Sequence, residues 1–247
     1  MPKIEAVNLT VTYPAKGGLE FICLDSLNAV FESNEINVIL GESGSGKSTL
    51  LKAIAGTMKY DGEILFDDVP SRKISPKNRK IAFVDQEITL YPNRTIFDNL
   101  ALPLSLSRLK PDEMRHKIHE TAKKLGILAT LSRLPRQISI GQQQRACLAK
   151  AIVKDPSVLL LDEPFSNIDE NRRKEERELL KRLAKEKGIT VVMATHLEED
   201  VLSLGERVHL LENGKISLSL KKEELPYSSN PMIRLMMASR LNGDNDG

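Results

Sequence analysis

The sequence predicts an α/β fold in which helices cover a mostly parallel sheet. Strand-like and helix-like segments alternate along most of the 247 residues, a pattern typical of parallel sheets with helices on both faces. A glycine-rich loop joins one apolar strand to a helix, and a second apolar strand ends in two acidic residues. A helical stretch over residues 95–134 interrupts the alternation and predicts a second lobe.

The first third of the chain is predicted to hold strands and one short helix. The strands are apolar or alternating runs bounded by turn residues, and they cover residues 4–12, 21–31, 36–40, 63–66 and 81–84. The helix spans Lys47–Ala55 and ends at Gly56, because glycine readily adopts the conformation that follows a helix end.

Helices dominate the middle of the chain, and the alternation then resumes. Pro111 suits a first helical turn and Gly126 a helix stop. The predicted helices cover residues 111–125, 142–153 and 170–187, and the predicted strands cover residues 158–161 and 190–194. Near the carboxyl end, residues 231–241 predict a short amphipathic helix docked onto the domain, and residues 242–247 a frayed tail.

Composition excludes some partners and favours an intracellular setting. The formal charge of +2 offers no electrostatic basis for binding nucleic acid or anionic lipid. Cys23 and Cys147 cannot form a disulfide framework, so we expect two small buried residues in a reducing compartment. The sequence has no signal-peptide pattern and no apolar run of about 20 residues, so work at a membrane would need a partner.

The glycine-rich loop predicts a phosphate-binding site. Residues Gly41–Ser48 match the pattern G-x-x-x-x-G-K-[ST] and lie between a predicted strand and a predicted helix. Backbone N–H groups and the positive end of the helix would surround the phosphates, with Lys47 at the β- and γ-phosphates and Ser48 on Mg²⁺. The motif by itself does not separate an ATPase from a GTPase, kinase or helicase. The predicted nucleotide-binding residues here are Gly41, Ser43, Gly44, Ser45, Gly46, Lys47, Ser48 and Thr49.

A second candidate site follows the apolar run at residues 158–161. The run ends in Asp162 and Glu163, and the carboxyl ends of parallel strands are where α/β folds bind ligands. Asp162 would hold the magnesium shell, and Glu163 would polarise the attacking water.

The segment Gln137–Arg145 resembles the signature motif of ABC ATPases, L-S-G-G-Q followed by Q-Q-R. Further motifs are similar to that family and occur in its order, so that the resemblance covers residues 4–216. They are Tyr13 for the aromatic that stacks on adenine, Gln86 for the Q-loop, Ser166–Asp169 for the D-loop and His196 for the switch histidine.

The resemblance implies a fold with a P-loop NTPase core, an antiparallel β subdomain and an inserted α-helical subdomain. The whole chain would be one ABC ATPase domain. Its core and β subdomain would take residues 1–86 and 155–220, its helical subdomain residues 87–154, and a short C-terminal extension residues 221–247.

The resemblance also implies a head-to-tail dimer with ATP and Mg²⁺ as ligands. Each ATP would lie between the phosphate loop of one copy and Ser139, Gly141 and Gln142 of the other. Glu163, His196 and Gln86 would be catalytic, with Ser48, Asp162 and Gln86 around the metal. Asp169 would connect the two sites across the dimer.

The signature motif carries a departure from the family pattern, and after His196 Leu197 and Glu198 stand where many relatives carry an acid first. Ile140 replaces the first glycine of the signature. If that position needs a positive φ or a very close phosphate, a β-branched side chain is unfavourable there. We expect nucleotide binding to persist and the hydrolysis rate to be affected.

Residues 91–104 resemble the corresponding stretch of bacterial importer subunits, which implies permease subunits as partners and a site on the inner face of the cell membrane. The second ATPase subunit would be an identical copy or a paired ABC subunit, and a solute-binding protein would be a further partner. Sugar importers of this type usually carry a C-terminal regulatory barrel, for which the roughly thirty residues after the last strand are too few. The alternatives are an exporter or lipid-extracting complex, a soluble ABC ATPase of DNA repair or ribosomes, and a nucleotide-gated clamp with little turnover.

Overall fold

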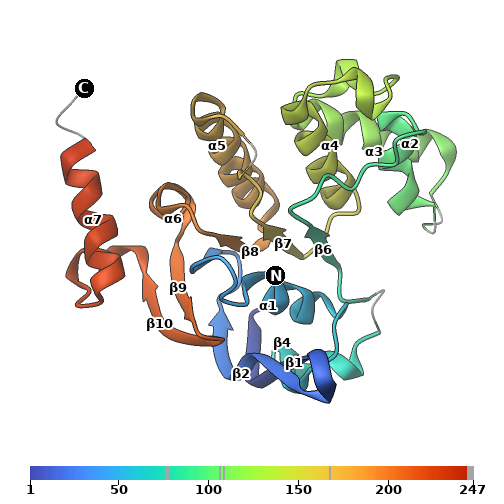
Figure 1. The fold of residues 1–247 in the computed structure, drawn as a ribbon. Coiled ribbons are helices and arrows are strands. Elements are labelled where there is room, and N and C mark those ends of the chain that lie inside the picture. Colours follow the sequence, from blue (N-terminus) through green and yellow to red (C-terminus); the bar gives the residue numbers. More distant parts are fainter. Residues whose placement is uncertain (76–77, 106, 108, 167, 244–247) are drawn as a thin grey trace.

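The computed structural model describes residues 1–75, 78–105, 107, 109–166 and 168–243 as two sheets with helices around them (Figure 1). The smaller sheet is antiparallel, with the order β2-β1-β4-β5. The larger sheet has the order β10-β9-β3-β8-β7-β6, and all its neighbouring strands run parallel except β9 and β10. The predicted fold class is therefore confirmed.

The strands and helices have the following bounds. The antiparallel sheet consists of β1 (Ile4–Pro14), β2 (Glu20–Phe31), β4 (Asp61–Phe66) and β5 (Val69–Pro70). The larger sheet consists of β3 (Ile36–Leu40), β6 (Ile81–Val84), β7 (Val158–Asp162), β8 (Thr190–Thr195), β9 (Arg207–Glu212) and β10 (Lys215–Lys221). The α-helices are α1 (Lys47–Ala55), α2 (Ile96–Ala101), α3 (Pro111–Lys124), α4 (Ile140–Ile152), α5 (Glu170–Lys187), α6 (Glu198–Leu204) and α7 (Pro231–Gly243). Short 3₁₀ segments cover Lys16–Gly18, Ser71–Lys73, Leu102–Leu104, Leu128–Thr130, Pro135–Gln137 and Lys222–Tyr227.

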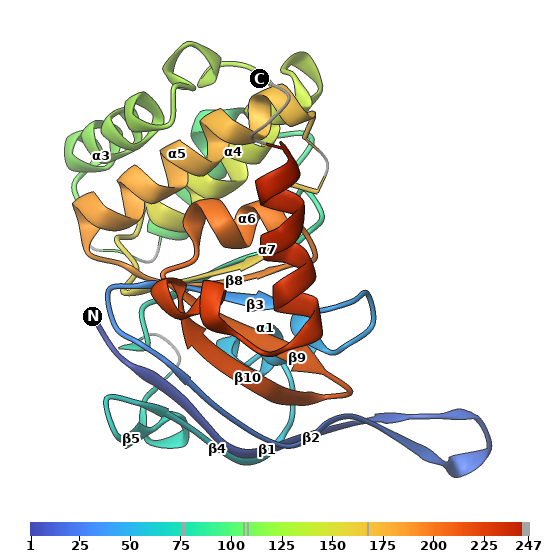
Figure 2. The same cartoon turned by 90° about the vertical axis from the view of Figure 1, so that its left-hand side faces the viewer.

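Each face of the larger sheet contributes to a separate apolar core, and β7 shows why its sequence has no polar alternation. Leu159 and Leu161 pack into the core beneath α2 to α7, whereas Val158 and Leu160 pack into the core shared with α1 and the antiparallel sheet. Successive strand residues point to opposite faces, so a strand covered on both sides must be apolar throughout. Figures 1 and 2 show helices above the sheet and α1 with the antiparallel sheet below it.

Most predicted boundaries agree with the structure within two residues, and the differences have local causes. The predicted helix over residues 142–153 begins earlier, at Ile140, because Ser139 caps it. The helix that starts at Pro111 ends at Lys124, just before Gly126 takes a φ of +66°. The strands β9 and β10, which complete the larger sheet, were not among the segments predicted individually.

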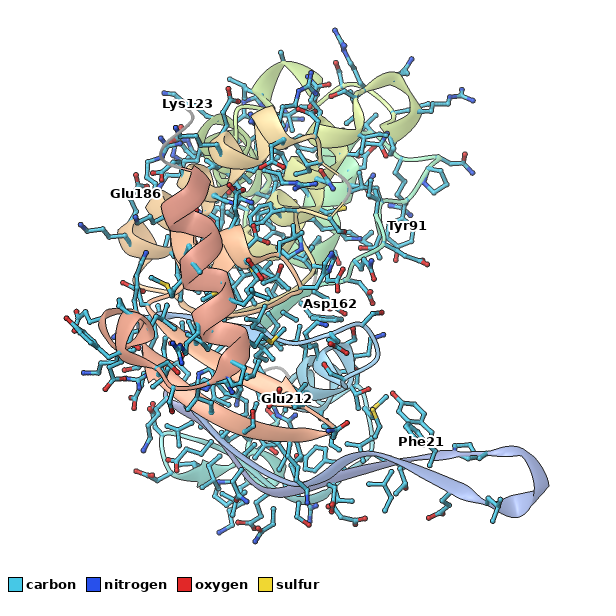
Figure 3. All side chains as sticks on the ribbon, turned by 60° about the vertical axis from the view of Figure 1, so that its left-hand side comes forward. Phe21, Tyr91, Lys123, Asp162, Glu186 and Glu212 are labelled. Atoms are coloured by element: carbon cyan, nitrogen blue, oxygen red, sulfur yellow. The ribbon has the colours of Figure 1, made fainter. Side chains whose placement is uncertain are left out.

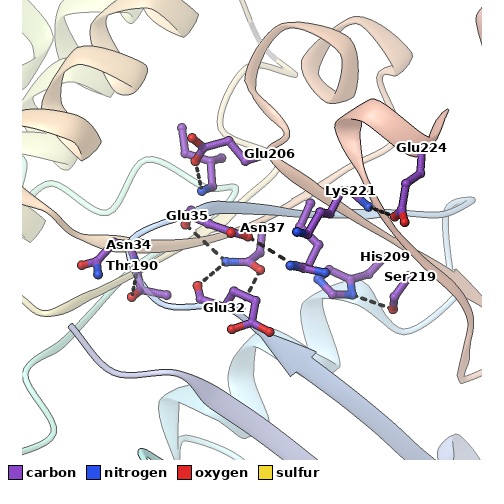
Figure 4. Close-up of polar contacts among 12 residues, drawn as sticks. Glu32, Asn34, Glu35, Asn37, Thr190, Glu206, His209, Ser219, Lys221 and Glu224 are labelled. Carbon is purple, nitrogen blue, oxygen red and sulfur yellow. Dashed lines mark hydrogen bonds and ion pairs between the residues drawn. The ribbon is translucent and has the colours of Figure 1, made fainter. Parts of the chain in front are cut away.

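A buried amide fixes the start of β3, the strand that leads into the phosphate loop. Asn37 is fully buried, and its Nδ2 donates to the carbonyl oxygens of Glu32, Glu35 and Val191 at 3.0, 3.2 and 3.3 Å. Its Oδ1 accepts the backbone N–H of Glu32 at 2.9 Å. Figure 4 shows Asn37 with Glu32 and Glu35. The side chain therefore supplies hydrogen bonds to backbone groups at the start of β3, where burial limits the access of water.

The helix α7 docks onto the rest of the chain, as predicted. Ile233 and Met236 are buried in the core that also includes residues of α5 and α6, while Leu235 faces outward. Residues 244–247 of the predicted tail lie outside the described residues. Nowhere in the described chain is a helix both long and apolar enough to span a bilayer. The division of the chain into a core, a helical subdomain and an extension stays a prediction.

Candidate nucleotide-binding site

The loop between β3 and α1 adopts a conformation that requires glycine at several positions. Gly44 and Gly46 have φ values of +83° and +106°, and Gly46 is the N-cap of α1. A Cβ atom on Gly41 would lie 2.5 Å from the carbonyl oxygen of Leu211. Left-handed backbone and close approach are the conditions under which glycine is favoured. The loop thus delivers the N-terminus of α1 to a point where an anion would meet its N–H groups.

Lys47 bridges this loop from inside. Its side chain is only 4% exposed, and its Nζ donates to the carbonyl oxygens of Gly41 and Glu42, both at 2.8 Å. Burial lowers the pKa of Lys47, and the carboxylates of Glu163 and Asp162 oppose this shift. The ammonium group therefore lies on the loop's inner side, next to the acidic end of β7.

Asp162 and Ser48 form the part of the site that fits a magnesium ion. Asp162 is buried, and its Oδ1 has no hydrogen-bond partner among the described residues. Burial raises the pKa of the Asp162 carboxyl, and the nearby Ser48 hydroxyl opposes this shift. Mg²⁺ is usually held by one or two carboxylates together with phosphate oxygens and water. A buried carboxylate with a free oxygen beside a hydroxyl fits that ligand set. Figure 3 labels Asp162 between the helices in the upper part of the view and Phe21 in the lower part.

Glu163 occupies a strained position immediately after β7. Its φ is +45°, and its N–H donates to the carbonyl oxygen of Ala194 at 2.9 Å. A left-handed conformation costs a non-glycine residue about 1–2 kcal/mol, so the surrounding structure must hold it. The resulting orientation places Oε1 3.9 Å from Nζ of Lys47 and Oε2 3.1 Å from Nδ1 of His196.

These contacts bring together residues from the carboxyl ends of three parallel strands. Lys47 follows β3, Glu163 follows β7 and His196 follows β8. The carboxyl end of a parallel sheet is the usual ligand-binding edge in α/β folds. A buried lysine, a carboxylate and a half-exposed histidine next to a phosphate-binding loop can bind a nucleoside triphosphate and activate a water molecule beside it.

Tyr13 lies against the phosphate-loop helix. Its hydroxyl is 3.1 Å from Oγ1 of Thr49, and it pairs with Phe21 across the β1–β2 hairpin. A cavity of about 560 Å³ is lined by Phe21, Cys23 and the loop residues from Gly41 to Ser45, among others. The adenine-stacking role of Tyr13 stays a prediction, and Phe21 was not among the residues predicted for the site.

The two cysteines differ in burial. Cys147 is buried, as expected. Cys23 is only half-buried, and its Sγ donates to Oγ1 of Thr49 at 3.4 Å, so the expectation of a buried residue was wrong for it. Its strand passes beside the loop at Gly46, and this brings the thiol to the edge of the same cavity.

The signature residues cap their own helix. Ser139 is the N-cap of α4, where its Oγ accepts the N–H of Gln142 at 3.3 Å and its N–H donates to Oε1 of Gln142 at 3.1 Å. Ile140 is 59% exposed and begins the helix, and it is not among the residues with positive φ. A positive φ at this position is therefore not required by the fold. Gly141 follows on the first turn, with Arg172 as its neighbour.

The remaining predicted residues lie around the same edge. Gln86 is exposed just after β6, and no hydrogen bond joins its side chain to Asp162, Glu163 or His196 in the described part of the chain. Ser166 donates from Oγ to the carbonyl oxygen of Glu163 at 3.0 Å. Asp169 caps α5 by accepting the N–H of Arg172 at 3.2 Å. Asn167, between them in the predicted D-loop, lies outside the described residues.

Comparisons with known proteins agree with this geometry. A protein-family model described as "ABC transporter" matches residues 24–166. The glucose import ATP-binding protein GlcV of Saccharolobus solfataricus is 41% identical over 231 residues, which are 91% of this chain and 65% of that protein. The xylose/arabinose import ATP-binding protein XacK of Haloferax volcanii is 38% identical over 218 residues, which are 87% of this chain and 57% of that protein. This chain thus spans less than two thirds of the length of either relative.

A solved structure gives a similar result. The dimeric bacterial ABC transporter cassette MJ0796 superposes with a TM-score of 0.79 and 31% identity, covering 89% of this chain and 98% of that one. The same cassette has been solved as a dimer in a post-hydrolysis state with ADP and Pi, and this chain matches it equally well. On the family match and the identities to its relatives, the chain belongs to the ABC transporter family.

Proposed function

We propose that this chain binds and hydrolyses ATP with Mg²⁺ and powers an ABC importer. The observation that carries the proposal is the position of Glu163, with one carboxylate oxygen 3.1 Å from Nδ1 of His196 and the other 3.9 Å from Nζ of Lys47. A base, a phosphate-binding cation and a hydrogen-bonding group then surround the point where the terminal phosphate would lie at the N-terminus of α1.

Lys47 and the loop backbone would bind the triphosphate. Lys47 would exchange its bonds to the carbonyl oxygens of Gly41 and Glu42 for bonds to phosphate oxygens, which are charge-assisted and stronger. Ser48 and Asp162 would hold the magnesium ion, which when bound neutralises phosphate charge. The free Oδ1 of Asp162 supports this assignment, because a buried carboxylate oxygen without a partner is costly.

Glu163 would act on the attacking water. It is positioned by its left-handed backbone and by the N–H bond to Ala194, and its side chain is partly shielded from solvent. His196 would hydrogen-bond the terminal phosphate and keep the water in line, while Gln86 would approach the metal from β6. Phosphoryl transfer depends mainly on such positioning and on electrostatic stabilisation.

Turnover would require a second subunit. Ser139, Gly141 and Gln142 begin α4, whose N-terminal N–H groups suit the phosphate of a nucleotide held by another copy. Within the described chain they make no hydrogen bond to the phosphate loop. The dimeric state of the solved cassette supports this arrangement, and Ser166 and Asp169 would lie where the two sites meet.

The importer assignment is supported by the names of the relatives, both of which are import ATP-binding proteins. A permease helix would enter the cavity of about 360 Å³ between β6 and α4. Lys150 lines this cavity, with Nζ donating to the carbonyl oxygen of Thr89 and lying 4.8 Å from the ring centroid of Tyr91. Lys80 and Lys154 line the same cavity, so a permease helix bearing carboxylates would match its charge. The chain would sit on the inner face of the membrane through this contact, with a solute-binding protein as a further partner.

Two measurements test the proposal. The purified chain should hydrolyse ATP at a specific rate that rises with protein concentration, because each site needs two copies; a rate independent of concentration with a monomeric species would contradict it. The affinity-tagged chain, isolated from membranes of its host, should bring down a protein with several membrane-spanning segments.

A charge reversal in the cavity provides the matched test of that contact. The variant Lys150→Glu should no longer co-purify with the permease but should still bind ATP. Lys181 is exposed on α5, so the variant Lys181→Glu should both co-purify with the permease and bind ATP. Equal recovery of the permease by both variants would place the permease contact elsewhere.

A further inference from the structure

A hydrogen bond between the residues on either side of His196 closes a tight turn at this residue. Thr195, the last residue of β8, is 1% exposed. Its Oγ1 accepts the N–H of Leu197 at 3.0 Å and donates to Oδ2 of Asp200 at 2.8 Å. One hydroxyl therefore connects the residue before His196 to the residue after it, which restricts the backbone at His196 itself.

Asp200 gives this hydroxyl its direction. The carboxylate is buried on α6, and its other oxygen, Oδ1, accepts from Nε of Arg177 on α5 at 2.7 Å. Arg177 is itself buried, and its Nη1 also donates to Oε2 of Glu199 at 2.8 Å. A carboxylate only accepts hydrogen bonds, so the Thr195 proton must point at Asp200. A lone pair of Oγ1 is thereby left for the N–H of Leu197.

His196 depends on such support because packing holds it weakly. Its side chain is 47% exposed, and its ring contacts Glu163 through Nδ1 at 3.1 Å. An exposed ring keeps a fixed place only if its backbone is fixed, and a displacement of about 1 Å in a catalytic group can cost a large factor in rate.

We propose that Thr195 and Asp200 are positioning residues that hold His196 against Glu163. The proposal rests on the proposed function, in which His196 takes part in hydrolysis. The competing explanation is that the buried ion pair only joins α5 to α6. That explanation requires Arg177 and Asp200 but gives the Thr195 hydroxyl no function, so variants of Thr195 separate the two.

The chain offers a matched control on the same strand. Thr190 begins β8 and is also buried; its Oγ1 accepts the N–H of Asn34 and donates to the carbonyl oxygen of Pro2, both at 3.0 Å. Thr190→Val and Thr195→Val therefore each remove one buried hydroxyl that accepts one backbone N–H and donates one hydrogen bond, at opposite ends of one strand. Both should lower the unfolding temperature to a similar extent, which removes general destabilisation as a cause of any difference.

The experiment measures ATP hydrolysis and the ring resonances of His196. Thr195→Val should lower kcat about tenfold or more with KM for MgATP changed by less than about twofold, since geometry is lost and binding is not. Thr195→Ser, which keeps the hydroxyl, should recover most of kcat, and Thr190→Val should keep it. The Cε1–Hε1 resonance of His196, assigned by its loss in His196→Ala, should move in Thr195→Val and stay in Thr190→Val.

A second variant covers the case in which Thr195→Val does not fold. In Asp200→Asn the amide oxygen would stay on Nε of Arg177, so the amide nitrogen would face Oγ1 of Thr195 and donate where the carboxylate accepted. The Thr195 hydroxyl would lose its acceptor. The kcat value should fall and the His196 resonance should move, whereas Glu199→Gln, which removes the other charge paired with Arg177 but has no bond to Thr195, should change neither.

The results separate failure of this proposal from failure of the proposed function. Wild-type kcat in Thr195→Val with an unmoved His196 resonance overturns the positioning role, as does a Thr195→Ser variant as slow as Thr195→Val. In both cases an inactive His196→Ala would leave the proposed function standing. Full activity of His196→Ala would overturn the role of His196 in hydrolysis and the positioning role with it.

Discussion

Oε1 of Glu163 lies 3.9 Å from Nζ of Lys47, so the end of β7 lies next to the start of α1. The pair joins an acid that follows β7 to a cation that opens α1, and both side chains are largely shielded from water. Shielding strengthens the interaction between them, because the effective dielectric constant falls away from solvent. The acid and the cation are therefore held close together, so that substitution of either one tests the proposed function.

Replacing Glu163 by glutamine should trap ATP in a closed dimer. Glutamine keeps the shape and a hydrogen-bonding oxygen but cannot take a proton from water, so kcat should fall by about 10²–10⁴. Gel filtration with ATP and Mg²⁺ should show a dimer for Glu163→Gln. The double variant with Lys47→Ala is the control and should stay monomeric. A monomer in both samples would contradict the two-subunit mechanism.

Lys47→Ala should remove nucleotide binding. The ammonium group would otherwise make charge-assisted hydrogen bonds to phosphate, and a loss of about 3 kcal/mol corresponds to a Kd more than 100-fold weaker. Titration with a fluorescent ATP analogue measures the change. Lys52→Ala is the matched control, since Lys52 lies on the same helix with its side chain 37% exposed and pairs with Asp85. Equal affinity of the two variants would refute the assignment of the phosphate loop.

Ile140→Gly should leave the ATPase rate unchanged or raise it. The side chain is 59% exposed on the first turn of α4, so its removal opens the approach to the helix N-terminus and leaves the core intact. Glycine costs a helix about 1 kcal/mol relative to alanine, and Ile140→Ala separates that cost from the loss of bulk. The measurement is the steady-state ATP hydrolysis rate of both variants, compared with the rate of the unmodified chain. A large loss of activity in both would show that isoleucine is a required feature.

Asn37→Ala should be among the more destabilising single substitutions. It would remove four hydrogen bonds to backbone groups that are buried or partly buried, and a buried polar group left without a partner costs about 1–3 kcal/mol. Urea unfolding should show a loss of about 3–5 kcal/mol. Asn28→Ala is the control: Asn28 also makes several hydrogen bonds, but it is exposed, so water can replace them. Similar losses in both variants would contradict the role assigned to burial.

His209 should make folding stability pH-dependent in mild acid. Burial lowers the pKa of His209 to about 3, and Nδ1 bonds Oγ of Ser219, drawn in Figure 4. Below the unfolded pKa of about 6.5 the unfolded chain binds a proton that the folded chain refuses, so stability falls as the pH drops from about 6.5 toward 3. The loss between pH 7 and pH 5 should be about 2 kcal/mol from this group.

The variant His209→Gln isolates that contribution. Glutamine does not titrate, so the free energy of unfolding should fall about 2 kcal/mol less between pH 7 and pH 5 than in the unmodified chain. Parallel curves of unfolding free energy against pH for the two proteins would show that His209 is not responsible.

Local sequence predicted most elements of the fold because each carries a complete local signal. The glycines between residues 40 and 47 mark a loop that must take left-handed backbone, and Gly44 and Gly46 do so. The unbroken apolar run at residues 158–161 predicts a strand covered on both faces, and its residues divide between two cores. The boundary at Ile140 was placed two residues late, because the capping bond of Ser139 depends on backbone geometry that no apolar pattern reports.

Tertiary structure alone decided which polar side chains meet. The hydrogen bonds that Arg177 and Thr195 donate to Asp200 join α5 and β8 to α6, and nothing in the spacing of these residues indicates that they pair. The same holds for Tyr13 and Thr49, which come together only because β1 passes beside α1. By itself the sequence determined the glycine-rich loop and the alternation of strands and helices, since both follow from neighbouring residues. The environment of His196 was decided by packing. The residues around it, such as Glu163 and Thr195, belong to segments that come together only when the sheet and its helices assemble.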